Sequence, residues 1–117
     1  MKPFSSWHPL TAEGVRSKAP EEPCAIQVRR QQGLVNYPNG KSAMVWYGYG
    51  ARGQDLLRRE FEGEIASPGQ LGQGPLLFRY LCGGDEALET INLLAHKFRR
   101  RFGRLPILLD DEVPPTT

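Results

Sequence analysis

Apolar side chains recur in patterns that predict three strands. Residues 24–30 carry them at every second position, which buries one face of a strand. Two further apolar runs, 43–47 and 76–81, lie close to glycine or proline, residues that interrupt regular structure. Asn39 and Gly40 predict a tight turn before the second run, because both residue types tolerate positive φ. The pattern therefore predicts a hairpin followed by a third strand.

A repeat of three and four residues predicts two longer helices. In the first, residues 55–65, apolar side chains lie four apart and Asp55 can cap the amino end. In the second, residues 85–102, the apolar repeat is longer, Asp85 offers a cap and Gly103 suits the carboxyl end. We expect both helices to pack on the strands.

The order of these elements predicts an α+β fold, a small and mostly antiparallel three-stranded sheet flanked by helices. A chain of 117 residues has room for one domain with one core. We assign residues 1–22 to an N-terminal segment with a short helix from Thr11 to Lys18. Residues 23–109 form the domain, and residues 110–117 form a flexible tail.

Composition restricts the possible functions. The formal net charge is only +2, so any binding to an acidic partner must use a local basic surface. No apolar run has the length of a membrane span or a signal-peptide core, so we expect a cytoplasmic protein with no membrane partner. Cys24 and Cys82 form no CxxC motif and are expected to be reduced, buried thiols. His8 and His96 are isolated, and no metal site is predicted.

Five short motifs follow one another in an order that resembles the GIY-YIG nuclease superfamily. The resemblance covers roughly residues 23–110 and implies the same α+β fold, called GIY-YIG-like below. The motifs are Pro23-Cys24-Ala25-Ile26, Trp46-Tyr47-Gly48, the helix segment Asp55-Leu56-Leu57-Arg58-Arg59, the helix from Ala87 onward, and Gly103-Arg104-Leu105-Pro106.

The resemblance also implies where catalytic side chains would lie. In that family a first-strand tyrosine and a second-strand aromatic position or activate water, an arginine stabilises the scissile phosphate, and a glutamate of the last helix binds a divalent metal. The matching positions here hold Ile26, Trp46, Arg59 and Ile91, with Arg58 replacing Arg59 if the alignment shifts by one. Isoleucine can neither exchange a proton nor bind a metal. The resemblance therefore implies a fold retained without metal-dependent hydrolysis.

The favoured hypothesis is a non-catalytic module that binds nucleic acid, DNA or RNA, or another partner through a local basic surface and needs no cofactor. Phosphate contacts of this kind are electrostatic and weaken with salt. The expected contact residues are Arg52, Arg58, Arg59, Lys97, Arg100, Arg101 and Arg104. The simpler interpretation is that these side chains lie on solvated helix faces, some of them paired with Glu60, Glu62 and Glu64.

Two alternatives stay open. In a diverged endonuclease, Tyr47, Arg59 and Glu89 would cut phosphodiesters with Mg²⁺ or Mn²⁺. Glu89 lies two residues from Ile91, roughly 200° around the helix, and would project from the opposite side. The third hypothesis is a protein-interaction domain of a larger system, because a basic cluster can equally face an acidic protein. The sequence does not decide the oligomeric state or the substrate.

Overall fold

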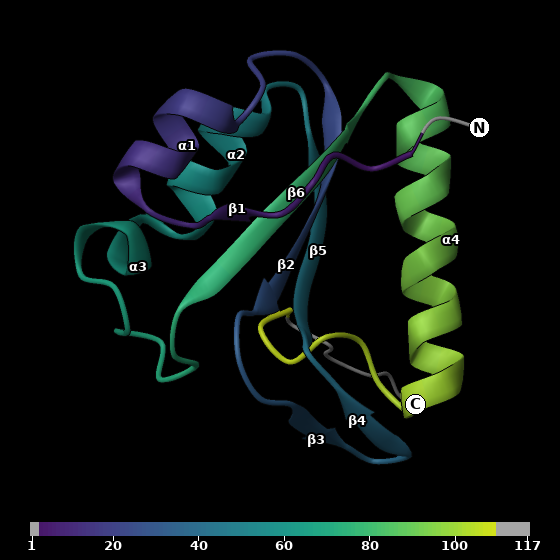
Figure 1. Ribbon diagram of the computed structural model, residues 1–117. Coiled ribbons are helices and arrows are strands. Elements are labelled where there is room, and N and C mark those ends of the chain that lie inside the picture. Colours follow the sequence, from purple (N-terminus) through teal and green to yellow (C-terminus); the bar gives the residue numbers. More distant parts are fainter. Residues whose placement is uncertain (1–2, 110–117) are drawn as a thin grey trace.

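Four antiparallel strands form the main sheet of the computed structural model, which describes residues 3–109. Their order is β1-β6-β2-β5 (Figure 1). Strand β2 (Cys24–Arg30) lies in the middle and pairs with β5 (Met44–Gly50) and β6 (Leu76–Cys82). The short β1 (His8–Pro9) pairs with the outer side of β6. The predicted α+β class is confirmed.

Helices cover both faces of this sheet. The helices α1 (Ala12–Lys18) and α2 (Gly53–Glu60) pack on one face, and the short α3 (Glu62–Ala66) follows α2. The long helix α4 (Asp85–Phe102) lies on the other face, against β2 and β5 (Figure 1). The sheet is therefore the middle layer, and each strand side chain points either toward α2 or toward α4.

The sheet has four strands, not the predicted three. His8 and Pro9 pair with Phe78 and Leu77, so the N-terminal segment contributes an edge strand. Two residues are too few to show an alternating pattern, and proline is normally excluded from all but edge positions. The short helix in this segment is confirmed, with Thr11 accepting a hydrogen bond from the backbone N–H at the third residue of α1.

The predicted hairpin turn is displaced by one residue. A separate two-stranded sheet, β3 (Val35–Tyr37) and β4 (Gly40–Ser42), turns at Pro38 and Asn39, not at Asn39 and Gly40. Proline presets the φ angle that the first turn position requires, which explains the shift. Gly40 instead pairs with Tyr37 across the hairpin.

The segment after β4 also departs from the prediction. The strand predicted over residues 43–47 extends further, so that Gly48 lies inside β5, opposite Ile26. The helix expected over residues 55–65 begins at Gly53 and is interrupted at Phe61, whose φ of −125° and ψ of 28° leave helical geometry. This break lets the Phe61 ring meet the Trp46 indole edge-on at 5.2 Å. Tertiary packing therefore overrides the helical repeat.

The last helix agrees closely with its prediction. It ends at Gly103, which adopts the left-handed conformation with φ of 88°. At the amino end, Gly84 holds the cap position without a side-chain hydrogen bond, and Asp85 is the first helical residue instead of the expected cap. The acidic side chain still lies in the first turn, where it complements the positive end of the helix dipole.

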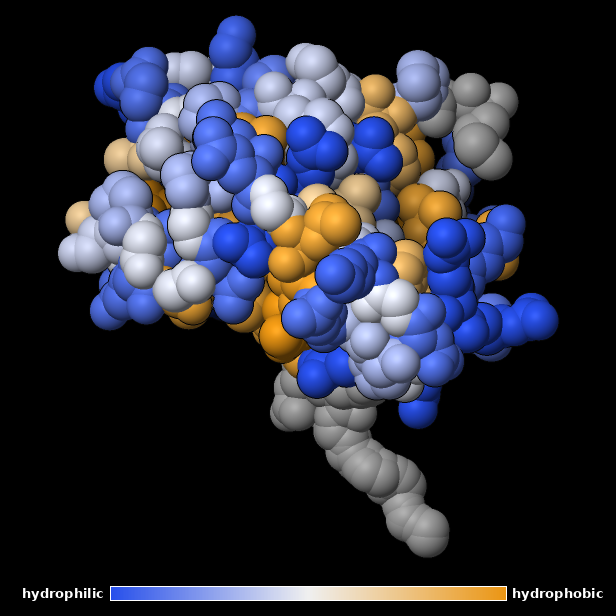
Figure 2. Space-filling model, turned by 60° about the horizontal axis from the view of Figure 1, so that its bottom comes forward, coloured by the Kyte–Doolittle hydropathy of each residue, from blue (hydrophilic) through white to orange (hydrophobic). Residues whose placement is uncertain are grey.

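The face of the molecule that Figure 2 draws is mostly hydrophilic. Figure 2 shows the end of the molecule that carries the β3–β4 hairpin, where a strip of apolar side chains runs between hydrophilic ones. Strongly hydrophilic side chains project on the α4 side of this view. Within residues 3–109, no helix combines the length and apolar character needed to cross a membrane. The predicted tail, residues 110–117, lies outside the described residues.

Candidate functional site

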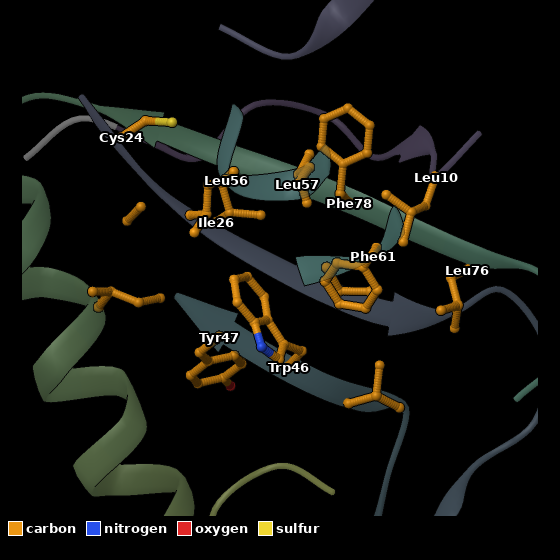
Figure 3. Close-up of a cluster of buried hydrophobic side chains, with 14 of the residues drawn as sticks. Leu10, Cys24, Ile26, Trp46, Tyr47, Leu56, Leu57, Phe61, Leu76 and Phe78 are labelled. Carbon is orange, nitrogen blue, oxygen red and sulfur yellow. The ribbon is translucent and has the colours of Figure 1, made fainter. Parts of the chain in front are cut away.

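The positions of the first two GIY-YIG-like motifs lie in the hydrophobic core. Ile26 is fully buried beneath Leu56 and Leu57 of α2 (Figure 3). Trp46 is 5% exposed and packs against Phe61. Apolar side chains therefore fill the space in which the resemblance would place the catalytic aromatic groups, and neither an isoleucine nor an indole can accept a proton there.

The sheet separates Arg59 from the other two residues of the endonuclease hypothesis, Tyr47 and Glu89. Tyr47 is 8% exposed and faces α4, whose Ile91 lines the same small hollow. Arg59 is exposed on α2, which covers the opposite face, and its Nε lies 3.3 Å from a carboxylate oxygen of Glu60. Glu89 is exposed, whereas Ile91 is buried, as the helical geometry predicted. No group of three or more potential metal ligands occurs among the described residues.

The basic residues near α2 do not form one surface. Arg52 bridges Glu21 at 2.6 Å and Asp55 at 3.0 Å. Arg59 lines a hollow with Arg52, whereas Arg58 lines a separate hollow beside α1. Since Arg52 and Arg59 each contact a carboxylate, their charge is partly compensated within the chain. The simpler interpretation, in which these arginines pair with nearby glutamates, is therefore confirmed for Glu60, which contacts Arg59.

Three basic residues of α4 do come together. Lys97, Arg100 and Arg101 line one shallow hollow on the outer face of the helix, and we call this set the α4 basic surface. None of the three forms an ion pair with a carboxylate within residues 3–109. Arg104 points elsewhere, because its Nε donates to the Leu105 carbonyl at 2.8 Å. The structure thus unites three of the seven predicted contacts.

A polar row under α4 was not predicted. The Arg79 Nε donates to Oε1 of Gln27 at 2.7 Å, and Gln27 is only 2% exposed. The Gln27 side chain also hydrogen-bonds the Tyr47 hydroxyl. Burial raises the pKa of Tyr47 to about 12, although Gln27 and the charge of Arg79 act in the opposite direction. At neutral pH the phenol is therefore protonated and cannot serve as a base.

Two arginines stack on aromatic rings beside this row. The guanidinium carbon of Arg79 lies 4.7 Å from the ring centre of Phe4 and 4.6 Å from that of Trp7. The guanidinium carbon of Arg29 lies 4.8 Å from the same Trp7 ring. These residues, Arg29 and Arg79 with Trp7, are called the arginine pair below. Arg29 and Arg79 each lie in a strand that the sequence predicts, but the sequence does not show that these strands pair and bring both side chains to Trp7.

The cysteines are directly opposite each other on β2 and β6. Neither cysteine forms a disulfide, as expected, but Cys82 is only half-buried, because it lies at the end of its strand. Burial, followed by Cys82 and Glu22, raises the pKa of Cys24 to about 12. Since the thiolate is the reactive form, Cys24 is unreactive at neutral pH.

Comparisons with known proteins add no relative to this picture. Searches against protein-family models, curated proteins and solved structures each found no match.

Proposed function

We propose that the protein is a non-catalytic, GIY-YIG-like module that binds nucleic-acid phosphate through the α4 basic surface. The observation that carries the proposal is the grouping of Lys97, Arg100 and Arg101 around one hollow, without a carboxylate partner among the described residues. Such a cluster can follow a phosphate backbone without reading bases. All three side chains are exposed, so this surface is accessible to a large partner.

The environment of the motif positions argues against hydrolysis by this module. Catalysis of phosphodiester cleavage needs a base or metal-bound water near a group that stabilises the phosphate. Tyr47 is protonated and lies on the face opposite the one that α2 and Arg59 cover, while Ile26 and Ile91 are buried. These observations support a module that binds nucleic-acid phosphate without cleaving phosphodiesters.

The test is a titration of fluorescent single- and double-stranded DNA and RNA at several salt concentrations. The variant combines Lys97→Ala, Arg100→Ala and Arg101→Ala. Its matched control, Arg16→Ala with Lys18→Ala and Lys41→Ala, removes the same charge elsewhere. For duplex DNA each phosphate contact contributes about 0.9 to the slope of log K against log salt concentration. We expect the α4 variant to lower that slope by roughly two to three and the control to keep it.

The same samples separate the alternatives. Equal losses of nucleic-acid affinity in both variants would show that only total charge matters and would contradict binding through the α4 basic surface. Cleavage with Mg²⁺ or Mn²⁺ that Arg59→Ala abolishes would contradict a non-catalytic module and support the diverged endonuclease. Failure of the wild type to bind any of the four probes would contradict nucleic-acid binding and support the protein-interaction alternative.

A further inference from the structure

The arginine pair concentrates positive charge on the α4-facing side of the sheet. Gln27 lies opposite Arg79 in the register of β2 and β6, and Arg29 follows two residues later in β2. Side chains two residues apart in a strand point to the same face. Both guanidinium groups therefore emerge from neighbouring strands on one face, and both reach the same Trp7 indole.

No acidic group neutralises this charge within residues 3–109. Neither Arg29 nor Arg79 forms an ion pair there, although both are half-buried. The pKa of Arg79 is lowered, mainly by burial and to a smaller extent by the charge of Arg29, while Tyr47 acts in the opposite direction. Stacking on an aromatic ring offsets only about 0.5–2 kcal/mol for each cation. Two like charges in this environment favour an anion between them.

One donor of the pair has no partner. The Nε of Arg29 is buried and makes no hydrogen bond within the described residues. Its counterpart, the Nε of Arg79, is occupied by Gln27. A buried donor without an acceptor is costly, and in native proteins such a group often marks the place of a water or an ion. The remaining N–H groups of both guanidinium forks add donors in a plane, which suits a tetrahedral oxyanion.

We propose that Arg29 and Arg79, with Trp7 against their guanidinium groups, bind a dianionic phosphate group, either inorganic phosphate or a phosphate monoester. Two positive charges match the charge of about −1.5 to −2 that such a group carries at pH 7. A phosphodiester carries a single charge and leaves one guanidinium uncompensated. The site goes beyond the proposed function, because it shares no residue with the α4 basic surface.

Isothermal titration calorimetry tests the site with three probes, inorganic phosphate, methyl phosphate and dimethyl phosphate. We expect methyl phosphate to bind at least tenfold more tightly than dimethyl phosphate at pH 7.5. Its affinity should fall below pH 6, as the monoester loses its second charge. Comparing methyl phosphate with inorganic phosphate then identifies the source: a clear preference for methyl phosphate indicates an ester ligand, and equal or tighter binding of inorganic phosphate indicates the free ion.

The decisive variant is Arg29→Gln. The unpartnered Nε means that this substitution removes no hydrogen bond from that atom, so the fold is expected to remain. We expect at least a tenfold loss of methyl phosphate affinity, and a smaller loss in Arg29→Lys, which keeps the charge but not the planar fork. Arg30→Gln is the matched control, since this neighbour points to the other face and donates to the carbonyls of Gln73 and Leu34.

A Trp46→Phe background leaves Trp7 as the single tryptophan and reports where the ligand binds. Methyl phosphate should change Trp7 fluorescence with the same dissociation constant that calorimetry gives. Three results would each overturn the proposal: no saturable binding by the wild type, unchanged affinity in a folded Arg29→Gln variant, or equal affinity for methyl and dimethyl phosphate. The triple alanine variant of the α4 basic surface should bind methyl phosphate with the affinity of the wild type, so the proposals for the two sites are tested independently.

Discussion

Gly48 leaves the space in which the Trp46 indole packs against the sheet. A Cβ atom on Gly48 would lie 2.1 Å from the Trp46 indole, whose ring atoms are its three nearest contacts. The indole is held in place by Phe61 and cannot move away without disturbing the core. We predict that Gly48→Ala lowers the free energy of unfolding by about 1–3 kcal/mol, measured by urea denaturation.

Gly63→Ala is the matched control for this substitution. Gly63 is exposed in α3, and a Cβ there would meet only the far end of the flexible Gln70 side chain. Alanine also favours the helix, so we expect stability within about 1 kcal/mol of the wild type. The packing argument fails if both variants unfold at the same urea concentration.

The burial of individual polar residues was beyond prediction. Gln27 alternates with apolar neighbours in β2, a pattern that predicts one buried and one polar face, yet Gln27 is 2% exposed under α4. The alternation itself was interpreted correctly, because Gln27 does point away from the face of Ile26. What the pattern cannot show is that α4 and the N-terminal segment cover that second face as well. The polar groups of the Gln27 side chain are satisfied by Arg79 and Tyr47, residues that only the folded sheet brings near.

At the scale of elements, long repeats were predictable and short segments were not. The 18 residues of α4 give five turns of apolar repeat and agree with the predicted bounds. The two residues of β1 exist as a strand only because β6 offers an edge. The break between α2 and α3 arises from the contact of Phe61 with Trp46, which local propensity does not encode.

The loop after α3 depends on one buried carboxylate. Glu64 was expected on a solvated helix face, but it is 3% exposed and accepts hydrogen bonds from the backbone N–H groups of Gly69 at 2.8 Å and Leu71 at 3.1 Å. We predict that Glu64→Ala costs about 1–3 kcal/mol of unfolding free energy, because both donors lose their acceptor. Amide hydrogen exchange at Gly69 and Leu71 should accelerate in the same variant.

Glu62→Ala provides the comparison, since Glu62 begins the same short helix and is exposed. Removing it should change stability by no more than about 0.5 kcal/mol. An equal effect of both substitutions would mean that helix charge, and not the anchored loop, determines stability here.

At the scale of the whole molecule, the candidate site depended on contacts distant in sequence. Basic residues within α4 were predicted as a group and remain one, because a helix keeps neighbours three and four residues apart on one side. Arg52, Arg58 and Arg59 are close in sequence, but they line two different hollows around α2. The arginine pair joins β2, β6 and the N-terminal segment, so no local pattern could have predicted it.

The Tyr37 hydroxyl links parts of the chain that are 70 residues apart. It donates to the Met44 carbonyl at 2.5 Å and accepts from the Ile107 N–H at 3.0 Å, while its ring meets Phe98 of α4 edge-on at 5.0 Å. Tyr37→Phe keeps the ring and removes both hydrogen bonds. We predict a loss of about 1–3 kcal/mol, because two backbone groups lose their partner, and faster hydrogen exchange at Ile107. Tyr80→Phe removes a hydroxyl that makes no hydrogen bond among the described residues, so its free energy of unfolding should stay near that of the wild type. A similar loss in Tyr80→Phe would contradict the stabilising role of the Tyr37 hydroxyl.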